Sequence, residues 1–70
     1  KFSEIIEVAQ KRIELDPTNL QHYITLTAAY LQAGRRVEAV QTLQEIIKLD
    51  PTTKDKMEYY IKEIQAGRNP

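Results

Sequence analysis

The feature that most constrains this chain is an internal repeat. The tetrapeptide Leu-Asp-Pro-Thr occurs at residues 15–18 and again at residues 49–52, a spacing of about 34 residues. When residues 2–18 are aligned with residues 36–52, seven of seventeen positions are identical, and most others keep their apolar or polar character. We call this alignment the repeat register. A fixed period of this length is typical of a solenoid, in which each repeat packs mainly on its neighbours.

Proline and glycine divide each repeat into helices. A helix is expected to end before each Asp-Pro pair, because proline lacks a backbone N–H and disfavours helix in the residue before it. Gly34 and Gly67 supply the left-handed residue that ends the other two helices. We expect Thr18 to cap the second helix, and Thr52 or Thr53 to cap the fourth. The predicted helices span about residues 2–15, 19–33, 36–49 and 53–66.

The composition of these segments supports the same assignment. They are rich in Glu, Lys, Gln, Leu, Ile and Ala, which favour helix, and their apolar residues recur at three- and four-residue spacing. Because the connections are short, neighbouring helices must run antiparallel. The sequence therefore predicts an all-α fold of about four helices.

The balance of charge argues against several classes of partner. Acidic and basic residues number ten each, so the chain lacks the basic excess that binds nucleic acid or an anionic membrane. There is no cysteine to supply a thiolate nucleophile or a disulfide, and no apolar run approaches the ~20 residues of a membrane span. We expect no nucleic-acid partner and no membrane insertion of this segment. A cytoplasmic location is favoured, with the bacterial envelope as the alternative.

A longer motif makes the resemblance to a known family specific. The chain reads Tyr23-x-x-Leu26-Thr27-x-x-Tyr30, then Ala39-x-x-x-Leu43, then Pro51. These spacings match the tetratricopeptide repeat (TPR) signature Trp-x-x-Leu-Gly-x-x-Tyr, Ala-x-x-x-Phe and Pro. The resemblance implies a TPR-like solenoid, an α-α superhelix of antiparallel helical hairpins. Thr27 and Ile46 depart from the small residues usual at their positions, so the local helix crossing is expected to be slightly wider.

The resemblance also suggests how the chain is divided. Residues 1–70 form a single TPR-like unit with one full repeat at about residues 20–53. Half-repeats at residues 2–16 and 54–67 flank it. The second Gln-Ala-Gly-Arg, at 65–68, follows the first, at 32–35, one position sooner than the repeat register requires, so the last helix is shortened. We therefore expect a fragment, or the C-terminal end of a longer array, with Asn69-Pro70 as a cut end or linker.

No set of residues indicates catalysis. His22 has no second histidine or carboxylate at ligand spacing, so a surface or partly buried helix position is favoured over a ligand or base. Acidic pairs such as Glu4 with Glu7 lie on polar helix faces, not in a dry concave site. Arg35 and Arg36 follow the central turn, where a solubilising role is favoured over contact with an acidic partner or phosphate. We predict no enzyme activity, no cofactor and no metal.

The resemblance implies a protein-binding groove. In TPR proteins the first helix of each hairpin lines a concave groove that receives an extended peptide or a helix. Members that clamp a C-terminal carboxylate use Lys and Asn there, which this face lacks. The apolar strip of Ile24, Ala28 and Leu31 favours an apolar or amphipathic helix, unless these residues cover a neighbouring helix instead. The expected groove residues are Gln21, Ile24, Thr25, Ala28, Leu31, Gln32, Glu58, Tyr59 and Lys62.

Two alternatives to groove binding remain open. Phe2, Ile5 and Val8 on the first helix would be exposed without a hairpin mate, so the unit could be structural and stack end to end with copies of itself. The closing Ile-Lys-Glu-Ile-Gln-Ala-Gly-Arg-Asn-Pro is similar to the ends of TPR domains appended to bacterial membrane proteins of the O-antigen ligase type. On that weaker alternative, the chain is an interaction appendage of a glycopolymer ligase-like protein.

Overall fold

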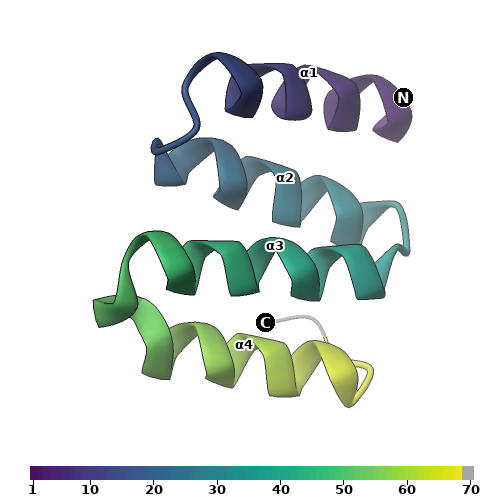
Figure 1. Cartoon of the computed structure of the whole chain (residues 1–70). Coiled ribbons are helices and arrows are strands. Elements are labelled where there is room, and N and C mark those ends of the chain that lie inside the picture. The colour runs from purple at the N-terminus through teal and green to yellow at the C-terminus, as the bar shows by residue number, and fades with distance from the viewer. Residues whose placement is uncertain (69–70) are drawn as a thin grey trace.

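The computed structural model describes residues 1–68, which form four antiparallel helices stacked in a single layer (Figure 1). The helices are α1 (Phe2–Leu15), α2 (Leu20–Gln32), α3 (Arg36–Leu49) and α4 (Lys54–Gln65), with a short 3-10 turn, η1 (Pro51–Thr53), before α4. The layer measures 28 × 27 × 14 Å. The all-α prediction is confirmed, and the helix bounds agree with the predicted ones to within one residue at either end. The predicted linker at residues 69–70 lies outside the described residues.

The turn between α1 and α2 differs from the prediction in its cap. Asn19, rather than Thr18, caps α2, and its side-chain oxygen accepts a hydrogen bond from the backbone N–H of Gln21 at 3.0 Å. Since α2 begins at Leu20, Thr18 lies one residue too early to reach the free N–H groups of the first turn. The helix start was therefore predicted correctly and the capping residue was not.

The turn between α3 and α4 also uses an acidic side chain that the sequence analysis assigned no role. The Asp50 carboxylate accepts from the backbone N–H of Thr52 at 3.2 Å and so caps η1. Thr53 occupies the position before α4 but makes no capping bond through its side chain. Gly34 and Gly67 do adopt the predicted left-handed conformation, with φ of 77° and 86°.

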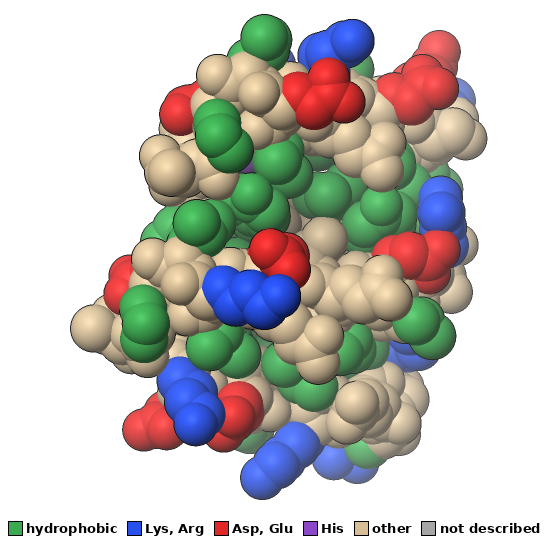
Figure 2. All heavy atoms as spheres, in the orientation of Figure 1, with side chains coloured by type: hydrophobic (Ala, Val, Ile, Leu, Met, Phe, Trp, Pro, Cys, Tyr) green, Lys and Arg blue, Asp and Glu red, His purple; other side chains and the backbone are tan. Residues whose placement is uncertain are grey.

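The apolar stripes of the four helices meet in two clusters. Figure 2 shows hydrophobic side chains gathered in the hollows between helices, while the charged side chains lie on the ridges. The first cluster joins α1, α2 and the start of α3, and consists of Ile6, Ala9, Leu26, Ala29, Tyr30 and Ala39. The second joins α3 and α4, and consists of Leu43, Ile46, Met57 and Ile64. Burial of these stripes is the main source of stability in a helical stack.

The crossing of α2 and α3 contains a buried polar pair. Thr27, which stands where the family signature has glycine, is 7% exposed, and its hydroxyl oxygen lies 2.6 Å from that of Thr42, which is 8% exposed. Thr27 Oγ1 also lies 2.8 Å from the carbonyl oxygen of Tyr23, and Thr42 Oγ1 lies 2.7 Å from that of Ala39. The extra bulk at position 27 is thus matched by a hydrogen-bonding partner on the facing helix.

The two arginines of the central turn have structural partners. The Arg35 side chain bonds the Glu38 carboxylate at 2.9 Å, and its guanidinium lies 5.0 Å from the centre of the Tyr30 ring. Arg36 donates hydrogen bonds to the carbonyl oxygens of Ile64 at 3.2 Å and Gly67 at 3.4 Å. A cation at the C-terminal end of a helix is favourable because free carbonyl groups and the helix dipole point toward it. Arg36 therefore fastens the end of α4 to the start of α3.

Candidate protein-binding groove

An open groove runs between α2 and α4, with α3 at its base. Its volume is about 370 Å³. The residues that line it are Ile24, Thr27, Ala28 and Leu31 of α2, Leu43 of α3, and Lys56, Met57 and Tyr60 of α4. Most of these side chains are apolar, so the groove offers a hydrophobic surface with few polar groups.

The α2 wall carries no formal charge. None of the thirteen residues of Leu20–Gln32 is Asp, Glu, Lys or Arg. Ile24 is 49% exposed and Ala28 is also exposed, while Leu31 is half-buried and packs against both hydrophobic clusters. Covering this wall would remove apolar surface from water without removing any charged group, so the wall is suited to an apolar partner.

The α4 wall adds an aromatic ring and one positive charge. Met57 is 8% exposed and forms part of the second cluster, whereas Tyr60 is half-buried at the groove edge. The Lys56 ammonium group lies 6.0 Å from the centre of the Tyr60 ring. Lys56 is the one charged residue among those that line the groove.

The residues predicted for the groove divide into two sets. Ile24, Ala28 and Leu31 line it, as the apolar strip suggested. The remaining six are exposed but do not line it, and their part in binding stays a prediction: Gln21, Thr25, Gln32, Glu58, Tyr59 and Lys62.

The position of Glu58 and Lys62 has a geometric explanation. At about 100° per residue, both lie on the flank of the α4 stripe opposite to Lys56 and Tyr60. The sequence locates the stripe but does not say which flank faces α2. Lys56 and Tyr60 could have been found only by knowing the direction in which the layer turns.

The remaining polar groups form ordinary surface interactions. Hydrogen bonding from Arg35 lowers the pKa of Glu38, and hydrogen bonding from Arg68 lowers the pKa of Glu63. His22 Nε2 lies 3.7 Å from the Asp16 carboxylate near the start of α2. Among residues 1–68, no three His, Cys, Asp or Glu side chains converge as a metal site would require.

A layer of antiparallel hairpins that follow one repeat register and carry an apolar groove defines a helical-repeat protein. A family model described as tetratricopeptide repeat matches residues 3–58, and the chain belongs to this family. TPR domains are generally protein–protein interaction modules and are typically non-enzymatic. The resemblance drawn from the signature residues is confirmed.

Comparison with curated proteins and with solved structures gave no match. None of the helices in the described part of the chain has the length and apolar character needed to cross a membrane.

Proposed function

We propose that the chain binds an apolar or amphipathic helix of a partner protein in the groove between α2 and α4. The observation that carries this proposal is the chemistry of the lining: an uncharged α2 wall with Ile24 half-exposed, opposite Met57 and Tyr60. A groove of this kind accepts the apolar face of an amphipathic helix. The side chain of Lys56 at the rim favours a partner with an acidic residue beside its apolar stripe.

The proposal includes no catalytic role. The family is typically non-enzymatic, and the carboxylates of the chain that accept hydrogen bonds from arginine, Glu38 and Glu63, do so at the surface. Of the alternatives, end-to-end association has its own support and is developed below. The assignment to a glycopolymer ligase-like protein stays a prediction.

Substitution of Ile24 tests the groove with little risk to the fold. The isotope-labelled chain would be titrated with a model amphipathic peptide that has leucine at helical spacing and glutamate beside the leucine stripe. We expect amide chemical shifts to change around Ile24, Ala28, Met57 and Tyr60. Ile24→Glu should abolish these changes, because it places an unpaired charge in the apolar contact.

Two further variants keep the result interpretable. Ser3→Glu adds the same charge at an exposed site on α1 that lines neither the groove nor another hollow, and should bind the peptide as the parent chain does. Leu31→Glu is less informative, since Leu31 packs against both hydrophobic clusters and its loss should also lower stability. Peptide shifts that map elsewhere, or that survive Ile24→Glu, would refute the proposed groove.

A further inference from the structure

The outer face of α1 has an apolar surface whose equivalent in α3 is fully covered. In the repeat register, Ile5 and Val8 of α1 correspond to Ala39 and Thr42 of α3. Ala39 and Thr42 are 0% and 8% exposed, because α2 packs on them. On α1, by contrast, Ile5 is 44% and Val8 is 51% exposed, and they line a hollow of about 490 Å³. We call Ile5 and Val8 the N-terminal surface.

The N-terminal surface is shaped to receive a helix of the α2 type. Thr42 and Ala39 contact α2 from the side of α3 that corresponds to Val8 and Ile5 on α1. Continuing the same register makes α4 the second helix of the α2 type, since Met57 and Ile64 are the repeat equivalents of Tyr23 and Tyr30. A helix such as α4 is therefore the element that this surface fits.

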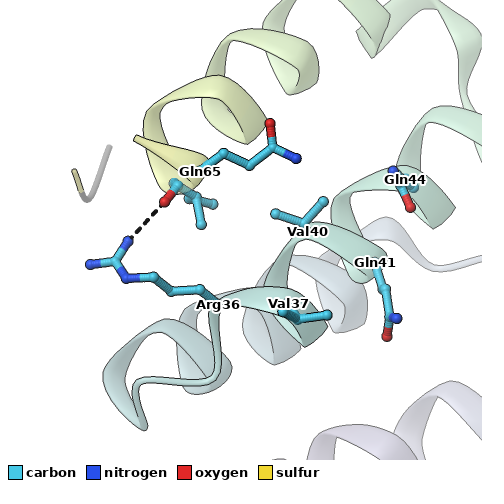
Figure 3. A pocket seen from close by; sticks show the side chains of 7 residues that line it. Arg36, Val37, Val40, Gln41, Gln44 and Gln65 are labelled. Atoms are coloured by element: carbon cyan, nitrogen blue, oxygen red, sulfur yellow. Dashed lines mark hydrogen bonds between the residues drawn. The ribbon is translucent and has the colours of Figure 1, made fainter. Parts of the chain in front are cut away.

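A second hollow lies between α3 and α4. It has a volume of about 450 Å³ and is lined by seven residues of these helices: Arg36, Val37, Val40, Gln41, Gln44, Ile64 and Gln65 (Figure 3). Ile64 is buried at its floor, and we call Val37, Val40, Gln44 and Gln65 the C-terminal surface. Val37 is 70% exposed, and Val40 and Gln65 point toward the same hollow.

The repeat register shows what the C-terminal surface is built to receive. Val40, which is only partly buried, is the repeat equivalent of Ile6. Ile6 is 5% exposed and belongs to the cluster that also contains Ala39 of α3. The C-terminal surface therefore fits a helix of the α1 and α3 type.

We propose that two copies of this chain associate head to tail, with α4 of one copy packed against α1 of the next to form an intermolecular hairpin. At one end each copy presents the helix type that fits the exposed surface at the other end, so a single contact covers both the N-terminal and the C-terminal surface. The contact is heterologous, so it continues into a filament or closes into a ring according to the rotation per copy.

The side chains that would meet agree with this pairing. The internal hairpin joins Thr27 of α2 to Thr42 of α3, and both are polar. The equivalent positions across the proposed contact are Ile61 of α4 and Val8 of α1, and both are apolar. A polar residue facing an apolar one would leave a buried hydroxyl unpaired, whereas these two pairs are each matched in kind.

Sedimentation velocity on the 70-residue chain, from micromolar to millimolar concentration, tests the proposal. We expect association that rises with concentration. Val8→Lys blocks the N-terminal surface and Val37→Lys blocks the C-terminal surface. Each should raise the dissociation constant roughly tenfold or more, because it buries an unpaired charge in the contact. Both positions are at least half exposed, so the helical circular dichroism spectrum should be unchanged.

Mixing the two variants distinguishes this geometry from any symmetric dimer. Val8→Lys keeps an intact C-terminal surface and Val37→Lys keeps an intact N-terminal surface, so the mixture should form dimers and nothing larger. Leu15→Lys, at a site that is 80% exposed and lines neither surface, is the matched control and should associate like the parent chain. A parent chain that stays monomeric at millimolar concentration, variants that associate undiminished, or a mixture that remains monomeric would each overturn the proposal.

Discussion

The buried threonine pair at the α2–α3 crossing allows a sharp test of how this hairpin is held together. Three short oxygen–oxygen contacts involve the hydroxyl groups of Thr27 and Thr42, yet the two groups have only two hydrogen atoms between them. At any moment, therefore, two of the three contacts are hydrogen bonds. The carbonyl oxygens of Tyr23 and Ala39 also accept the regular helical N–H bonds, so neither depends on a threonine hydroxyl.

This count sets the expected free energies. Thr27→Val leaves the Thr42 hydroxyl free to donate to Ala39, and Thr42→Val leaves the Thr27 hydroxyl free to donate to Tyr23. Each single variant thus loses one hydrogen bond without stranding a donor, and should lower the free energy of unfolding by ~1 kcal/mol. The double variant replaces both hydroxyls with methyl groups of similar size. Its stability should lie within ~0.5 kcal/mol of the parent chain, because a dry apolar pair has no polar group left to satisfy.

Urea unfolding followed by circular dichroism measures all four members of this double-mutant cycle. Thr25→Val is the matched control. The Thr25 hydroxyl makes the same bond to a carbonyl four residues earlier, but it is exposed and has no partner on another helix. Its stability should hardly change. A double variant that loses the full sum of the two single effects would refute the reasoning, as would a single variant that costs more than ~3 kcal/mol.

Three other substitutions test individual contacts by the same unfolding assay. Arg36→Ala should lower the free energy of unfolding by ~1 kcal/mol and speed amide hydrogen exchange in the last turn of α4, because Arg36 donates hydrogen bonds to carbonyl groups at that end. Unchanged exchange there would contradict this role. Gly34→Ala should cost about 1–2 kcal/mol from its positive φ alone, since nothing lies near the added methyl group, and a neutral result would argue against the turn geometry. Hydrogen bonding from Arg68 lowers the pKa of Glu63 in the folded chain below its ordinary 4.5, so the pair stabilises the fold above that pH and the stabilisation is lost as the pH falls further. Glu63→Gln should therefore weaken the fall of the unfolding free energy on the acid side. An unchanged pH dependence would count against the pair.

The helices could be predicted from sequence because their limits are local. Proline and glycine end a helix through their own backbone geometry, whatever the rest of the chain does. The capping residues were harder to predict from sequence, since Thr18 and Asn19 are both good caps and a shift of one residue decides between them. The capping role of Asp50 was missed for another reason: the 3-10 turn that it caps is visible only in three dimensions.

The two central arginines show where sequence reasoning stops. Next to each other in a polar turn, Arg35 and Arg36 look equivalent, and a solubilising role was favoured for both. Arg35 points to Glu38 on its own helix and to the Tyr30 ring, whereas Arg36 reaches the end of α4, far along the chain. Only the packing of α3 on α4 brings those carbonyl groups within reach of Arg36 and not of Arg35.

The repeat register also connects the groove to the proposed association. Glu58, Lys62 and Gln65 of α4 correspond to Ile24, Ala28 and Leu31 of α2, which wall the groove. In a head-to-tail pair, α4 would present these residues to α2 of the next copy across a second groove.

That second groove would differ from the first in charge. Its α4 wall would carry an acidic and a basic residue where the first groove has isoleucine and alanine, so the two grooves should prefer different partner helices. Association would add a recognition surface instead of covering one. Glu58→Ala with Lys62→Ala should then change peptide binding only at concentrations where the chain associates; an equal effect on the monomer would place these residues in the first groove after all.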